Sequence, residues 1–151
     1  MAIRNSVKAL IIQDGRILVT KNQDQEGYFY LCPGGGQEFG ETFHETLQRE
    51  CLEEIGREVQ EIGELIFVRE LVGKNYGLPS VHQVEYYFSC TILDSGNFIS
   101  QGVNPDEHQV GVEWLPIADI IKYRFYPQEM REVILRYENG ESVPIYLGAI
   151  N

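Results

Sequence analysis

The chain has 151 residues, of which 43% are hydrophobic and 23% charged, and its formal net charge is −11. This length fits one domain, residues 1–151, that is long enough to bury a real core. The acidic balance argues against a groove for nucleic-acid polymers, which needs a basic stripe, and against an anionic membrane surface. A small anionic substrate is still compatible with this charge if metal ions bridge the two.

The cysteines and the N-terminal segment indicate a cytoplasmic protein. Cys32, Cys51 and Cys90 are widely spaced and odd in number. This pattern favours reduced thiols over a disulfide framework, and the spacing does not match a zinc motif. The apolar run 7–12 is interrupted by Lys8 and is too short for a signal peptide or a membrane span.

The first third of the chain predicts a β-hairpin followed by a short strand. Residues 7–12 and 17–20 are apolar, and residues 13–16, with Asp14-Gly15 at the centre, form the predicted turn between them. Residues 28–31 predict a short strand, which the proline and glycines of positions 33–36 bring to an end.

The clearest predicted helix covers residues 42–55. Thr42 and Glu45 match a capping box at its start, and Gly56 is suited to its end. One sector of this helix is apolar and should pack on a sheet, with acidic side chains at its rim. The apolar positions of that sector are Leu47, Cys51 and Ile55.

The remaining segments complete a mixed α/β sandwich. We predict strands at 64–72 and 83–93, loops at 74–80 and 95–108, a short helix at 117–122 and a helix at 127–137. Pro127 is placed in the first turn of the last helix, where its missing N–H costs nothing. The tail, residues 143–151, carries no clear pattern.

Three carboxylates crowd one face of the predicted helix. Glu50, Glu53 and Glu54 stand at i, i+3 and i+4, and the glycine-rich turn 33–36 precedes their helix. Helix geometry places Glu50 and Glu54 about 40° apart and Glu53 about 60° to one side. Such carboxylates repel one another unless a cation lies among them, and Mg²⁺ or Mn²⁺ suits a site made of oxygen ligands. A glutamate-rich helix face is usually only solvated.

The spacing around this triplet favours the functional interpretation. The window resembles the Nudix box, G-x5-E-x7-R-E-U-x-E-E-x-G-U, in which U is a bulky aliphatic residue. Cys51 and Arg57 replace the two U residues, whereas every fixed position matches. The seven matching positions are Gly35, Glu41, Arg49, Glu50, Glu53, Glu54 and Gly56.

This resemblance to the Nudix hydrolase family implies an α/β/α sandwich around a mixed sheet. It also implies hydrolysis of a nucleoside diphosphate linked to another moiety, with Mg²⁺ or Mn²⁺ as cofactor. Carried onto this chain, it makes Glu50 and Glu54 the main metal ligands and Glu53 a ligand or base. It further implies that the carbonyl of Gly35 completes the metal site. Glu41 and Arg49 would brace the loop and the helix.

Several residues outside the box are further candidates. Family members often place another catalytic glutamate in a late loop, and Glu107 is the best-placed one here. Glu70 and Glu85 are alternatives, although pairing with a nearby cation explains them equally well. One aromatic side chain of residues 28–30 could stack on a base. The sequence does not separate phosphate contacts from ordinary strand-edge charges among the cations Arg4, Lys8 and Arg69.

These features predict a cytoplasmic, metal-dependent pyrophosphohydrolase with a small nucleotide-derived substrate. Nucleotide sugars, ADP-ribose, dinucleoside polyphosphates and damaged nucleoside triphosphates all remain open. The alternative is a regulatory module that binds a nucleotide or ADP-ribose without cleaving it. Such modules usually lose box carboxylates, and this chain keeps all three. The resemblance also makes a homodimer an option.

Overall fold

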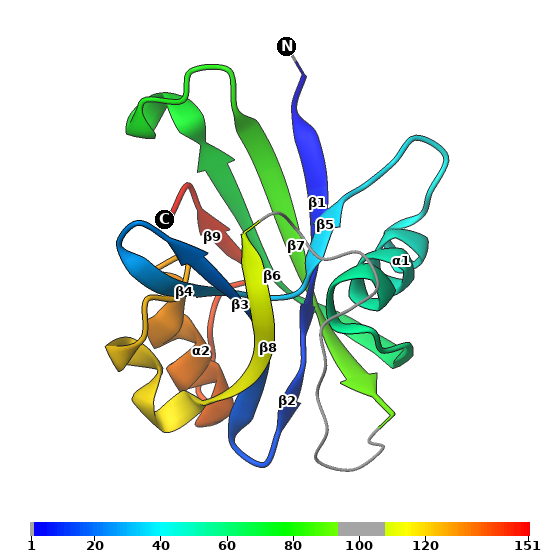
Figure 1. Cartoon of the computed structure of the whole chain (residues 1–151), viewed down its shortest axis with the longest axis vertical. Coiled ribbons are helices and arrows are strands. Elements are labelled where there is room, and N and C mark those ends of the chain that lie inside the picture. The colour runs from blue at the N-terminus through cyan, green and yellow to red at the C-terminus, as the bar shows by residue number, and fades with distance from the viewer. Residues whose placement is uncertain (1, 94–107) are drawn as a thin grey trace.

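Two β-sheets carry the fold, with helix α1 (Phe43–Ile55) on one side and helix α2 (Met130–Glu138) on the other (Figure 1). The structure is a computed structural model and describes residues 2–93 and 108–151. The larger sheet has five strands in the order β5–β1–β7–β6–β9. These strands are β5 (Gly34–Gly36), β1 (Arg4–Leu10), β7 (His82–Ile92), β6 (Val59–Val72) and β9 (Tyr146–Gly148). Because β1 is parallel to β7 and antiparallel to β5, the sheet is mixed, as predicted.

The second sheet is antiparallel and is built around one long strand, β3. Its four strands are β2 (Ile12–Gln13), β3 (Arg16–Asp24), β4 (Gly27–Leu31) and β8 (Gln109–Pro116). Asp14 and Gly15 have φ values of 51° and 73°. Positive φ at both central residues is what a type I′ hairpin turn requires. The predicted turn at 13–16 and the predicted strand at 28–31 are therefore confirmed.

The apolar run near the N-terminus belongs to both sheets, which the sequence did not predict. Strand β1 lies in the larger sheet between β5 and β7. Of the two strands in this run, β2 alone pairs with β3. Val7, Ala9, Leu10 and Ile11 are all buried, so the run does not alternate between a core face and a solvent face. Continuous burial of this kind is typical of a strand covered on both faces.

Helix α1 begins and ends as its sequence predicts. The Thr42 side chain accepts a hydrogen bond from the backbone N–H of Glu45 at 3.2 Å, and the Glu45 carboxylate accepts one from the N–H of Thr42 at 2.9 Å. This reciprocal pair is a capping box. Gly56 follows the last turn with φ of 66°, in the left-handed conformation that glycine adopts easily.

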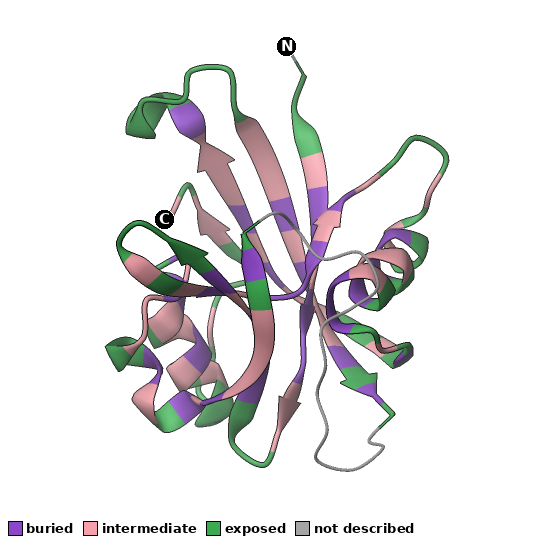
Figure 2. Cartoon of the chain, viewed as in Figure 1, coloured by how far each residue is buried: buried purple, intermediate pink, exposed green. Residues whose placement is uncertain are grey.

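Two hydrophobic cores fix the helices on the sheets (Figure 2). In the first, Leu47, Cys51 and Ile55 of α1 are fully buried against β1, whereas Leu52 is 44% exposed. This packing determines which side of α1 faces the glycine-rich strand. In the second, α2 and the 3₁₀ helix η2 (Ile117–Lys122) pack on the other side of the sheets. No helix in the described ranges is long and apolar enough to cross a membrane.

Several element predictions need correction. The glycine turn at 33–36 contains the short strand β5, strand β8 precedes η2, and the tail contributes β9. The 74–80 loop overlaps the 3₁₀ helix η1 (Gly73–Tyr76), and the 95–108 loop, except His108, lies outside the described residues. Helix α2 begins at Met130, because Pro127 belongs to a preceding turn in which its carbonyl accepts the Met130 N–H at 3.1 Å.

We predict that Gly34→Ala lowers the melting temperature by at least about 5 °C. Gly34 has φ of 141°, and a Cβ there would overlap the carbonyl oxygen of Val7. Such backbone strain costs about 1–3 kcal/mol before the overlap is counted, and about 2–4 °C is lost per kcal/mol in a chain of this size. Differential scanning calorimetry would measure the shift.

Gly111→Ala is the matched control. A Cβ at Gly111 would meet only the Lys21 side chain, at 3.9 Å, and its φ is not positive. We expect it to melt within about 2 °C of the wild type. Equal melting temperatures for the two variants would contradict the assigned role of Gly34.

Candidate functional site

The glycine-rich strand β5 and helix α1 are joined by a buried hydrogen bond. The backbone N–H of Gly34 donates to Oε1 of Glu54 at 2.9 Å, and Glu54 is only 3% exposed. Strand β5 is an edge strand of the larger sheet, and β1 is its only neighbour among the described strands. The Glu54 carboxylate therefore lies beside the backbone of the glycine-rich strand and not at the outer rim of the helix.

Glu50 lies against the next glycine of the same strand. A Cβ built on Gly35 would stand 2.5–2.6 Å from the carboxylate atoms of Glu50. Only glycine leaves this carboxylate enough room, since real Cβ atoms essentially never approach so closely. The structure thus brings together Glu50 and Gly35, two of the predicted metal ligands.

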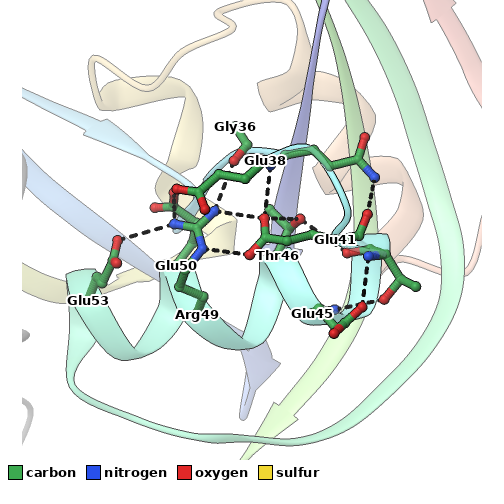
Figure 3. Close-up of polar contacts among 10 residues, drawn as sticks. Gly36, Glu38, Glu41, Glu45, Thr46, Arg49, Glu50 and Glu53 are labelled. Atoms are coloured by element: carbon green, nitrogen blue, oxygen red, sulfur yellow. Dashed lines mark hydrogen bonds and ion pairs between the residues drawn. The ribbon is translucent and has the colours of Figure 1, made fainter.

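Arg49 holds the acidic cluster together (Figure 3). Its Nε and Nη2 donate to the two carboxylate oxygens of Glu41, at 2.8 and 3.0 Å. Its Nη1 donates to Glu50 at 2.9 Å and to Glu53 at 3.5 Å. Nη2 also donates to the carbonyl of Gly36 at 3.0 Å. One guanidinium group therefore contacts three carboxylates and the glycine-rich strand.

Glu41 is the main partner of Arg49. Glu45 and Glu53 lie four residues to either side of Arg49 on α1; Glu53 makes the 3.5 Å contact, whereas the Glu45 carboxylate is used by the helix cap. The Glu41 carboxylate also accepts hydrogen bonds from the N–H of Glu38 and the hydroxyl of Thr46. The hydrogen bonds from Arg49, more than any other contact, lower the pKa of Glu41 to about 2.

The three box carboxylates differ in exposure. The side chain of Glu53 is 31% exposed and that of Glu50 is 15% exposed, whereas Glu54 is buried. Their oxygen atoms are the donors that a hard divalent ion prefers. Within the described residues, however, no group of three or more His, Cys, Asp or Glu side chains is arranged to hold a metal ion. The metal-ligand roles of Glu50, Glu53, Glu54 and Gly35 therefore stay predictions.

Glu85, one of the alternative candidates, is a member of a buried polar network. Its Oε1 accepts hydrogen bonds from Nε of Arg69 and the hydroxyl of Tyr87, both at 2.8 Å, and Oε2 accepts one from Gln83 at 2.7 Å. Burial raises the pKa of Glu85, but the charges of Lys8 and Arg69 outweigh it and leave the pKa below its usual value. Pairing with a nearby cation, which was the other explanation for Glu85, is therefore observed, and the cation is Arg69.

Glu70, another acidic candidate, contacts residues outside the box. Glu70 accepts a hydrogen bond from the Tyr146 hydroxyl at 2.5 Å and lies 2.9 Å from Nε2 of His82. These contacts, the Tyr146 hydroxyl first, lower the pKa of Glu70. Glu107 lies outside the described residues, so its catalytic role is still a prediction.

Of the three aromatic residues before the glycines, Tyr28 is the most open. Tyr30 is 8% exposed and belongs to the core, whereas Tyr28 is 49% exposed. Nζ of Lys21 lies 4.0 Å from the centre of the Tyr28 ring and 3.1 Å from Oε1 of Glu113. Lys21 and Glu113 were not predicted from the sequence, because only the pairing of β3 with β8 brings them together.

We predict that Glu41→Gln lowers the melting temperature at pH 7 and that this difference shrinks in acid. The pKa of Glu41 is about 2 in the fold, against 4.5 for a free side chain. A depressed pKa stabilises the fold fully above about 4.5, and the contribution is lost as the pH falls towards 2. Thermal melts between pH 7 and pH 3 would measure the difference.

Glu61→Gln, which removes one exposed carboxylate charge on β6, is the control for the loss of a single surface charge. A pH-independent difference for Glu41→Gln would show that its carboxylate charge does not stabilise the fold.

Comparison with known proteins agrees with this geometry. The NUDIX domain family model matches residues 2–137. The nucleoside triphosphatase NudI of Escherichia coli is 30% identical over 131 residues, which cover 82% of this chain and 89% of that protein.

Solved structures show the same fold. A NUDIX hydrolase from Nitrosomonas europaea has a TM-score of 0.72 and 20% identity, with 95% of this chain and 94% of that chain covered. An ADP-ribose pyrophosphatase from Streptococcus suis has a TM-score of 0.63 and 19% identity, with 95% and 97% covered. The predicted α/β sandwich with a mixed sheet is thus confirmed. With its complete box and these similarities, the chain belongs to the NUDIX domain family as a Nudix-type hydrolase.

Proposed function

We propose that this chain is a pyrophosphohydrolase that uses Mg²⁺ or Mn²⁺ to cleave a nucleoside diphosphate linked to another moiety. The observation that carries the proposal is the placement of the box carboxylates. Glu54 is hydrogen-bonded to the backbone of Gly34, and Glu50 lies against Gly35, so both carboxylates meet the same strand. Members of this family generally act with divalent metal ions, and an all-oxygen donor set suits Mg²⁺ or Mn²⁺.

Each box residue has a distinct proposed role. Glu50, Glu54 and the carbonyl of Gly35 would hold the metal, which when bound would withdraw charge from the diphosphate and lower the pKa of a bound water. Glu53 is the most exposed of the three carboxylates, and among the described residues its side chain is held only by a 3.5 Å contact with Arg49. This freedom suits it to orient or deprotonate the attacking water. Arg49 would hold the acidic side chains in place.

The similar proteins suggest where to look for the substrate. A nucleoside triphosphatase is similar over most of its own length, whereas the ADP-ribose pyrophosphatase is similar mainly in fold. We therefore place nucleoside triphosphates first in a substrate panel, followed by ADP-ribose, nucleotide sugars and dinucleoside polyphosphates. We further propose a small-molecule substrate and not a nucleic-acid polymer, since the net charge is −11. A cytoplasmic location is part of the same proposal. A homodimer fits this proposal.

The competing function is binding without hydrolysis. A regulatory module of this fold would retain the substrate-binding surface but lack some box carboxylates. All three carboxylates are present here, and two of them contact the glycine-rich strand. We therefore favour the enzyme.

We predict that hydrolysis depends on the metal. Purified protein would be incubated with the panel and Mg²⁺ or Mn²⁺, and released phosphate would be measured after coupling to a phosphatase. EDTA should abolish turnover, and excess Mg²⁺ should restore it, because several carboxylates need a cation to bind an anionic substrate. Unaltered substrates throughout, together with tight calorimetric binding of one of them, would instead support the regulatory module.

We predict that Glu54→Gln lowers kcat at least about a hundredfold. Losses of this size follow the removal of one group that stabilises charge in a transition state. The glutamine keeps an oxygen that can accept the Gly34 N–H, so the change removes charge while preserving that hydrogen bond. Steady-state kinetics on the best panel substrate, with a parallel thermal melt, would measure both effects.

Glu132→Gln, an exposed charge change on α2, is the control and should keep full activity. Near-full activity of Glu54→Gln would contradict its role as a metal ligand.

A further inference from the structure

The space above Gly36 is occupied by an arginine from another strand. A Cβ built on Gly36 would overlap Nε, Cζ and Nη2 of Arg4. Gly36 does not have a positive φ, so its backbone conformation is open to any residue. A larger residue at position 36 would therefore fill the space that the Arg4 guanidinium occupies.

Arg4 has no anionic partner in the part of the chain that the structure describes. Arg49, Arg69 and Arg124 each donate to a carboxylate, whereas Arg4 takes part in no hydrogen bond or ion pair within residues 2–93 and 108–151. Acidic residues outnumber lysine and arginine by 23 to 12 in this chain. An exposed arginine without a carboxylate, next to a carboxylate cluster, is thus available to an external anion.

The arginine and the carboxylates flank the same edge strand. Gly35 lies against Glu50, and Gly36 lies against Arg4. Successive residues of a strand point to opposite faces, so Arg4 and Glu50 stand on opposite sides of β5. Strand β5 is the outer strand of the larger sheet, next to β1 (Figure 1). A ligand at the carboxylates can therefore extend around this edge to Arg4.

A hollow opens at the same place. Its cavity volume is about 560 Å³, and it lies between residues 2–5 and the loop 37–41, with Glu41 of the box in its wall. Asn5 and Gln37 face each other here, with Nδ2 of Asn5 donating to Oε1 of Gln37 at 3.2 Å. Phe39, also in the wall, is fully exposed. The hollow thus combines the Arg4 guanidinium, two amide side chains and an open aromatic ring with two glutamates, Glu38 and Glu41.

We propose that Arg4 binds the outermost phosphate of the substrate and that this hollow is a phosphate subsite beside the box. The planar guanidinium can donate two parallel hydrogen bonds to phosphate oxygens. This inference rests on the proposed function and specifies its substrate class. A nucleoside triphosphate extends an anionic group beyond the diphosphate, whereas ADP-ribose and nucleotide sugars extend a neutral sugar. Arg4 therefore favours triphosphates.

The test compares Arg4→Gln with the wild type on a nucleoside triphosphate and on ADP-ribose, with Mg²⁺ present. For the triphosphate we expect kcat/KM to fall about tenfold or more, mainly through a higher KM, as loss of a hydrogen bond to a charged group predicts. For ADP-ribose the change should stay below about threefold. Arg16→Gln, the same charge change at an exposed position of the β2–β3 hairpin, should alter neither substrate.

A second variant tests the location directly. Adding Gly36→Lys to Arg4→Gln directs a lysine side chain from β5 into the space that the Arg4 guanidinium occupies in the wild type. We expect it to recover at least about a third of the lost kcat/KM for the triphosphate. Equal losses for both substrates, or an unchanged KM for the triphosphate, would overturn the inference.

The outcome is separable from the proposed function. If the wild type hydrolyses no panel member, the proposed function fails, and calorimetry with inorganic tripolyphosphate and Mg²⁺ tests Arg4 instead. Binding at least about tenfold weaker in Arg4→Gln than in Arg16→Gln would support the subsite. Equal affinity in the two variants would overturn it.

Discussion

Electrostatic repulsion among crowded carboxylates is the constraint around which this structure is organised. Glu50, Glu53 and Glu54 occupy little more than one turn of α1, and Glu41 approaches them from the preceding loop. Arg49 supplies a compensating charge through contacts with three of these four groups. One guanidinium cannot neutralise four carboxylates, so the cluster retains a negative potential towards cations. The same imbalance that makes the cluster costly is what the proposed divalent ion would offset.

The surrounding fold keeps these charges in position. The apolar side of α1 is buried against β1, which prevents the helix from turning its acidic side away from the glycine-rich strand. Each of the three glycines leaves space for a different neighbour. Gly34 accommodates the backbone of β1, Gly35 accommodates Glu50, and Gly36 accommodates Arg4. The β1 backbone, the Glu50 carboxylate and the Arg4 guanidinium therefore all approach this strand closely. A side chain at any of the three glycine positions would push its neighbour away.

Local features of the site were predictable from the sequence, and long-range ones were not. The capping box, the glycine at the helix end and the buried sector of α1 depend on residues within one helix, so their spacing identifies them. The contact of Arg4 with Gly36 requires the pairing of β1 with β5, which no local pattern encodes. The division of residues 4–13 between two sheets also depends on distant partners. For the same reason, the Lys21–Glu113 pair appears only when β8 lies beside β3.

The pairing of the N-terminal strand has a consequence for how the protein is made. Residues Arg4 to Leu10 pair in parallel with Gln83 to Ser89, so β1 leaves the ribosome well before its partner strand β7 has been made. Contacts between such distant segments are slow to form, since a long loop must close first. We therefore expect the sheet, and the acidic site at its edge, to assemble late and as one unit. Until then the side chains of Val7, Ala9 and Leu10 in β1, which the finished fold buries, stay exposed and favour aggregation.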